Sequence, residues 1–312
     1  MTAVDVGSHH GPQHVPGSLR AWADRLTRPA TTRTTPIAVR VVTWALATLA
    51  GLALWLVIFG LFLSGLAEAH QQHDLYDNFR AALASGTVPV QGPIAEGQPV
   101  AMLTSSAGGL DNIVVVEGTS STALRAGPGH LPATPLPGQA GVSVIMGRSS
   151  SYGAPFGSIT HLRPGDKVVA VSGLGTFTYS VMDVRRPGTP EPTQLPPSGG
   201  VLTLVTSEGN GWRSGWAPSH EVFVDMALVG QPASSGLISG IPRTSDLPMH
   251  SDTRGMYPLI LWLQLLLAAV IVAAWARVRW GRWQTWLVFV PIALTALWGA
   301  SENFWLLLPN ML

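Results

Sequence analysis

The sequence predicts a mainly β fold, a closed β-barrel of about 7–8 strands outside the membrane, joined to three transmembrane α-helices. Three long segments are almost free of charge, as expected of helices that cross a bilayer. Between the first two, short strand patterns alternate with turn residues and no long helix interrupts them. Only 11% of the residues are charged, whereas soluble domains contain about 25%.

Composition excludes several functions. The 312 residues carry a net charge of +1, which gives no support for nucleic-acid binding. The chain has no cysteine, so disulfides, thiolate metal sites and cysteine nucleophiles are excluded, while the redox compartment stays open. Lys167 is the only lysine among 18 basic residues, which suggests an actinobacterial-type coding bias more than a function.

The first apolar segment, 41–67, contains no charge and is long enough to span a bilayer with tilt. The sequence AEA at 67–69 resembles a signal-peptidase site, but the apolar run is about twice the length of a signal-peptide core. We therefore predict that residues 37–67 form a retained transmembrane helix.

Two further spans, 256–276 and 283–308, flank a basic loop at 277–282. The positive-inside rule places this loop and the basic N-terminal segment in the cytoplasm, and residues 68–255 on the outer side of the membrane. The basic residues are Arg20, Arg25, Arg28, Arg33 and Arg40 before the first span, and Arg277, Arg279 and Arg282 in the loop.

Residues 1–36 are rich in Pro, Thr, Gly and His, which predicts a disordered cytoplasmic tail. Neither a carboxylate nor a cysteine completes a metal site with His9, His10 and His14. Seven tryptophans from Trp262 to Trp305 lie in or beside the last two spans. They indicate an interfacial belt or, alternatively, a packing surface for a membrane partner. Gln264 lies within the second span and Glu302 near the outer end of the third.

The outward region divides into a stalk helix with its linker (68–98), the barrel (99–229) and a second linker (230–255). Leu75, Phe79 and Leu83 form a helical stripe that we expect to end at Gly86. The expected strands are 99–104, 112–117, 142–147, 167–172, 176–184, 201–206 and 221–229.

Three motifs within 99–229 occur in a specific order. Residues 114–141 contain GPGHLPATPLPGQAG, 144–168 read VIMGRSSSYGAPFGSITHLRPGDKV, and 202–207 read LTLVTS. They resemble the sortase family, especially class E, whose corresponding motifs are GPGHxPxTxxPGxxG, a YGAPF segment after the catalytic histidine, and LTLVTC. The resemblance implies a sortase-like closed barrel and a membrane-anchored cysteine transpeptidase that cleaves C-terminal sorting signals.

The departures from the family pattern fall on its chemistry. The resemblance places the catalytic histidine at Arg148, the nucleophile at Ser207 and the catalytic arginine at Glu221, the last within a residue or two. Arg213 could otherwise supply a guanidinium. Arginine at 148 cannot act as a base, serine is a weaker nucleophile than a thiolate, and Glu221 would repel an oxyanion. Three such changes predict that catalysis has been lost.

Two alternatives remain open at these positions. Ser207 could work as a nucleophile with His130 or His220, although no Gly-x-Ser-x-Gly elbow surrounds it. Alternatively, Arg148 and Glu221 could form a salt bridge across the former cleft, with their charged atoms within about 4 Å. LPATP at 131–135 resembles an LPxTG sorting signal, but we interpret it as part of the turn block.

We therefore expect a catalytically inactive sortase-like membrane protein that acts as a binding or scaffolding subunit of a membrane protein complex. No cofactor, metal or nucleic acid is expected. The expected partners are membrane or cell-surface proteins, bound through the last two spans and the barrel cleft. The alternative is a transpeptidase or hydrolase with Ser207 as its nucleophile.

Overall fold

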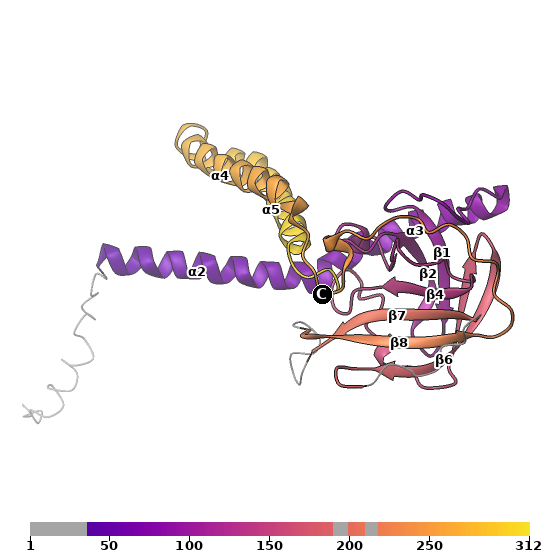
Figure 1. Cartoon of the computed structure of the whole chain (residues 1–312). Helices are drawn as coiled ribbons and strands as arrows, with labels where there is room; N and C mark the ends of the chain where they lie inside the picture. Colours follow the sequence, from indigo (N-terminus) through magenta and orange to yellow (C-terminus); the bar gives the residue numbers. More distant parts are fainter. Residues whose placement is uncertain (1–35, 190–198, 210–217) are drawn as a thin grey trace, which may run out of the picture. The chain divides into compact units, whose positions relative to one another are not determined.

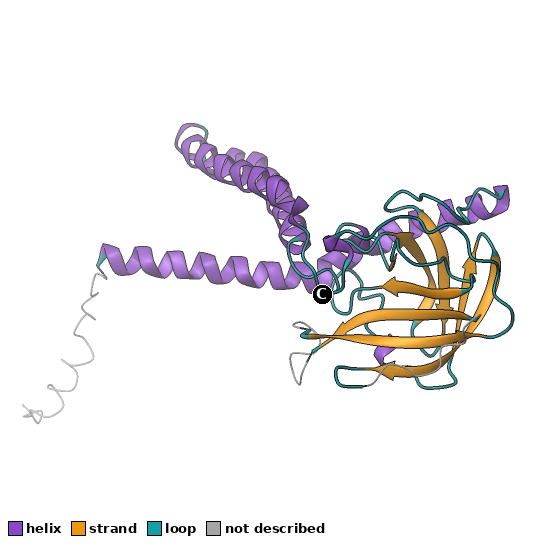
Figure 2. Cartoon of the chain, viewed as in Figure 1, coloured by secondary structure: helices purple, strands orange, loops and turns teal. Residues whose placement is uncertain are grey.

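The computed structural model describes residues 36–189, 199–209 and 218–312 (Figure 2). The predicted disordered tail, apart from its last residue, and Arg213 lie outside the described residues. The chain forms two units, residues 1–52 and 53–312. The second contains the barrel, the helix that leads into it and the C-terminal helix pair.

One helical segment runs from Ile37 to Ser85 and comprises α2 (Ile37–Ile58), the π-helix η1 (Phe59–Leu63) and α3 (Ser64–Ser85). It ends at Gly86, whose left-handed φ of 67° caps the last turn. Within η1, a Cβ added to Gly60 would lie 1.8 Å from the Trp305 ring, so glycine is required there for close packing.

Two further helices, α4 (Met256–Arg279) and α5 (Arg282–Leu306), pack against each other in the C-terminal half of the second unit. They and the segment Ile37–Ser85 are the three described helices that are long and apolar enough to cross a membrane. This number agrees with the three spans predicted from charge-free runs.

The barrel closes in the strand order β1-β2-β3-β4-β7-β8-β6-β5, with β5 paired back to β1. Figure 1 labels most of these strands. The predicted fold class, a closed β-barrel with three apolar helices, is confirmed. Sequence patterns missed only the two-residue strand β3, which is too short to show alternation. The strands are β1 (Pro99–Ser105), β2 (Leu110–Glu117), β3 (Gly129–His130), β4 (Gly141–Met146), β5 (Lys167–Ser172), β6 (Gly175–Arg185), β7 (Gly200–Glu208) and β8 (His220–Leu228).

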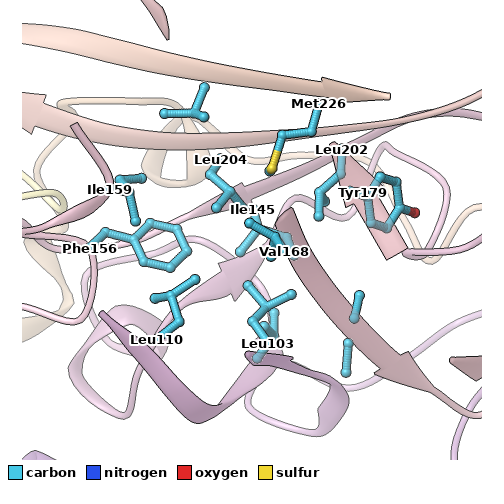
Figure 3. Packing of buried hydrophobic residues seen from close by; sticks show 14 of the residues in the cluster. Leu103, Leu110, Ile145, Phe156, Ile159, Val168, Tyr179, Leu202, Leu204 and Met226 are labelled. Atoms are coloured by element: carbon cyan, nitrogen blue, oxygen red, sulfur yellow. The ribbon is translucent and has the colours of Figure 1, made fainter. Parts of the chain in front are cut away.

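The barrel interior is filled by apolar side chains from most of its strands (Figure 3). Leu204 and Met226 reach it from β7 and β8, and Phe156 closes one end from the loop after β4. This continuous core gives β7 a rigid position, so the residues at its end are held precisely.

Helix α3 packs against the barrel wall instead of standing clear as a stalk. Gln72 accepts a hydrogen bond from the Val114 backbone N–H at 2.9 Å and donates to the Ala126 carbonyl at 2.7 Å. Phe79 is fully buried beside Val114. The predicted stripe of Leu75, Phe79 and Leu83 therefore faces β2 and the loop that follows α3.

Candidate functional site

Strands β4 and β7 are parallel neighbours, and their ends bring two of the predicted site residues onto one outer face of the barrel. Met146, the last residue of β4, lies opposite Val205 of β7, and the Gly147 N–H donates to the Val205 carbonyl at 2.9 Å. Arg148 is the residue after Gly147, and Ser207 lies two residues beyond Val205 on the same face of β7. The chain course thus explains why these two positions share a site.

Ser207 is almost fully buried, with 2% of its surface exposed. Its Oγ donates a 2.6 Å hydrogen bond to the backbone carbonyl of Met311, and it lies 2.8 Å from the Ser149 Oγ. No hydrogen bond within the described part of the chain joins Ser207 to a histidine or carboxylate. The hydroxyl is therefore held by neutral oxygen atoms and not by a base.

Arg148 is fully buried, and burial lowers the pKa of its guanidinium to about 10. Its Nε donates to the Leu124 carbonyl at 3.2 Å and its Nη2 to the Ser121 carbonyl at 3.1 Å. Its Nη1 donates to the Ser151 Oγ at 3.2 Å and the Leu312 carbonyl at 3.3 Å. Arg148 therefore links the 121–124 loop, the loop after β4 and Leu312 through hydrogen bonds.

The predicted salt bridge between Arg148 and Glu221 is wrong: the described residues contain no such ion pair. Glu221 lies opposite Ser207 on β8, but it lines a separate pocket of about 510 Å³ together with Arg185 and Arg186. Arg148 points away, toward the 121–124 loop, because the carbonyls there and at Leu312 supply its acceptors.

The structure does not bring either candidate histidine to Ser207. His130 is buried in the turn block, where its Nδ1 lies 2.8 Å from a Glu117 carboxylate oxygen and its Nε2 lies 3.0 Å from the Pro135 carbonyl. His220 lies on β8 with its Nε2 3.7 Å from a Glu208 oxygen. Both rings are thus engaged by other partners.

The LPATP segment, 131–135, packs within the same turn block. Thr134 donates to the Leu131 carbonyl at 2.8 Å and accepts from the Val144 N–H at 3.2 Å. These contacts fix the turn between β3 and β4, as expected for a structural role.

One component of the site was not predicted from the sequence, namely the C-terminal segment formed by residues 308–312. Asn310 and Met311 are buried against the barrel, and the Met311 carbonyl contacts both Ser207 and Ser149. A usable signal was present: Pro309 stops the preceding helix, and a polar asparagine follows within an otherwise apolar run. Nothing in these five residues, however, indicated the surface to which they would bind.

No metal centre is formed by the described residues, since no group of three or more His, Asp or Glu side chains could hold an ion. The site consequently offers hydroxyls, carbonyl oxygens and one buried guanidinium. Such groups can bind a polypeptide backbone, because each pairs with a backbone N–H or carbonyl.

Comparison with known proteins assigns part of the chain to a family. Residues 108–212 match the family model of the sortase domain, and the chain therefore carries a sortase-family domain. Among solved structures, sortase E from Streptomyces avermitilis is 30% identical, with 45% of this chain and 93% of that chain covered and a TM-score of 0.37.

Two other solved structures show the same kind of similarity. The Clostridium perfringens sortase D5 transpeptidase is 18% identical over 52% of this chain and 99% of that chain, with a TM-score of 0.41. The SrtA sortase from Actinomyces oris is 25% identical over 45% of this chain and 85% of that chain, with a TM-score of 0.38. No curated protein matches the chain.

Proposed function

We propose that this protein is a class E-like sortase homologue that has lost transpeptidase chemistry and serves as a binding or scaffolding subunit at the outer face of a bacterial plasma membrane. The observation that carries the proposal is the state of Ser207: its hydroxyl donates to a carbonyl and is paired with neither histidine nor carboxylate among the described residues.

The chemistry of the three family positions supports loss of activity. A serine needs a base to become nucleophilic, and Arg148 remains protonated at neutral pH even with its pKa lowered to about 10 by burial. Glu221 stands at the position that the resemblance gives to the catalytic arginine, and its carboxyl group offers no guanidinium donor for an oxyanion. Each substitution removes one function, and the described residues offer no replacement near Ser207.

A multi-pass topology supports the scaffolding role. In the proposed arrangement the N-terminus and the loop around Arg279 are cytoplasmic, while residues 68–255 lie outside. One span suffices to anchor a barrel, so the α4–α5 pair is available for helix contacts with other membrane proteins. Its large exposed side chains include Trp275, Val278 and Trp286.

Loss of activity is tested with a serine-reactive fluorophosphonate on the full-length protein in mild detergent, read by mass spectrometry. We expect no adduct at Ser207, because no base activates it. The Ser207→Ala variant provides the background. An adduct at residue 207 that disappears in Ser207→Ala and in His130→Ala or His220→Ala would establish a working serine nucleophile instead.

The scaffolding role is tested by placing a photoreactive residue at Trp275, which is 57% exposed. We expect a crosslink to one discrete membrane protein in cells. The matched control is Trp262, which packs inside the hairpin against Gly299 and should crosslink only within the chain. Crosslinks from position 275 to lipid alone would contradict a partner on this face.

A further inference from the structure

The C-terminal segment, residues 308–312, contacts the Ser207 site chiefly through backbone atoms. The Met311 carbonyl accepts from Ser207 at 2.6 Å, and the Ser149 backbone N–H donates to the same carbonyl at 3.2 Å. The next carbonyl, of Leu312, accepts from Arg148 at 3.3 Å and also from the Ser151 hydroxyl. The Ser149 hydroxyl also donates to the Met311 carbonyl at 3.3 Å, so two consecutive backbone oxygens meet five donors, which come from the loop after β4 and the end of β7.

Two side chains of the segment are also recognised. Met311 is 0% exposed and packs among Leu124, Met146 and Val205, which form an apolar pocket on the outside of the barrel. The Asn310 Nδ2 donates to the Thr119 carbonyl at 2.8 Å and the Leu247 carbonyl at 3.0 Å. A buried amide with two such acceptors discriminates strongly against a side chain that lacks the donor.

We propose that the Ser207 site is a peptide-binding site for a Pro-Asn-Met-type segment in a turn, closed by the Leu312 N–H donating to the Pro309 carbonyl at 3.1 Å, and that the protein's own residues 308–312 occupy it. The proposal deepens the binding role put forward above and rests on it. The proposal explains the burial of Arg148, because a fully buried guanidinium needs carbonyl acceptors and the bound segment supplies one of them.

Asn310 and Met311 are the positions that the site reads through their side chains. An external peptide that carries this pair is therefore the class of ligand able to compete with the segment.

Occupancy is tested by thiol labelling, since the chain has no cysteine of its own. In full-length Ser207→Cys, we expect maleimide to react at least ~100-fold more slowly than in Ser234→Cys, an exposed position in the linker. Releasing the segment with Asn310→Ala and Met311→Asp should bring the two rates within ~10-fold of each other. Equal rates for Ser207→Cys with and without the release would overturn the proposal.

Specificity is tested on the released Ser207→Cys variant with a capped synthetic peptide of sequence LPNML. We expect it to restore protection of the thiol introduced at position 207, whereas the scrambled peptide LMNPL should not. A thiol in the barrel wall, Ser172→Cys, is the control for local opening and should stay protected throughout. Equal protection by both peptides would refute recognition of the Asn310–Met311 pair.

A second measurement needs no release. The double variant Ser207→Cys with Met311→Cys should form a disulfide readily under mild oxidant, whereas Ser234→Cys with Met311→Cys should not. Failure of the first pair to crosslink faster than the second would refute docking. Because these readouts report occupancy, a Ser207 that reacts with fluorophosphonate only after release of the segment would end the claim of inactivity while leaving this result intact, whereas reaction before release would count against occupancy.

Discussion

Strands β5 and β7 belong to the same barrel but are buried differently. In β5 the residues alternate between buried and partly exposed, with Val168 and Ala170 inside and Val169 and Val171 outside. In β7 every residue from Gly200 to Ser207 is buried. A sheet strand buried on both faces must be covered twice, once by the core and once from outside.

The second cover explains the difference. At the end of β7, Val205 and Ser207 face outward, and Met311 of the C-terminal segment lies on them. Among the residues that the structure describes, the outer face of β5 has no such cover, and its side chains remain partly exposed. A strand buried on both faces therefore points to an external cover, and at the end of β7 that cover comes from 104 residues further along the chain.

The largest loss of stability is expected for a substitution on the inner face of β7. Replacing Leu204, which is fully buried in the core, by alanine should lower the free energy of unfolding by about 2–5 kcal/mol because it leaves a cavity. Thermal unfolding in detergent measures the change. Lys167→Ala, at an exposed position of β5, is the control and should lie within about 0.5 kcal/mol of the parent.

The next largest loss of stability is expected at Arg148, which holds the C-terminal segment on the barrel. Arg148→Ala should cost about 2–4 kcal/mol, because it empties buried volume and leaves the Leu124 and Ser121 carbonyls without a donor. Arg125→Ala removes the same charge from a half-buried position and should cost less than about 1 kcal/mol. Equal losses of thermal stability would show that Arg148 has no special structural role.

The comparison of the two strands is sharpened by an identical substitution on each outer face. Val205→Ala should destabilise by about 1–2 kcal/mol, since it removes contacts with Met311, while Val169→Ala should cost about 0.5 kcal/mol or less. If the C-terminal segment is first released, the two costs should converge. Persistence of the difference after release would mean that the segment is not the cover.

The smallest expected effect is a pH dependence of stability that involves Glu208, the last residue of β7. The Arg186 guanidinium, 2.7 Å away, lowers the pKa of the Glu208 carboxyl below its ordinary value of 4.5. This pair therefore adds stability above pH 4.5, which is lost as the pH falls through the lowered pKa. Glu208→Gln and Arg186→Gln should both flatten the acid side of the curve of melting temperature against pH. An acid limb that keeps its full slope in both variants would exclude this pair as its source.

Much of the fold could be predicted from local pattern. The β5 run KVVAVS alternates, and the β7 run LTLVTS is continuously apolar or β-branched, so both strands could be identified from their own residues. The positions of Ser207 and Arg148 followed from motif order along the chain. That they share one face follows from the parallel pairing of β4 with β7.

The interactions within the site could not be predicted from local sequence pattern. The direction of the Arg148 side chain depends on carbonyls at Ser121, Leu124 and Leu312, which lie far apart in the sequence. The expected pairing with Glu221 considered charge alone and overlooked these neutral acceptors. Likewise, five apolar-looking residues after a helix do not reveal which surface will bury them.

The covering segment follows α5 directly in the sequence, and this order has a consequence for biogenesis. In the proposed topology the barrel leaves the ribosome and crosses the membrane well before the third span is made. The outer face of β7 then stays bare until α5 has been inserted and its trailing residues have emerged on the far side. Docking of Met311 thus marks the moment at which insertion of the last helix is complete.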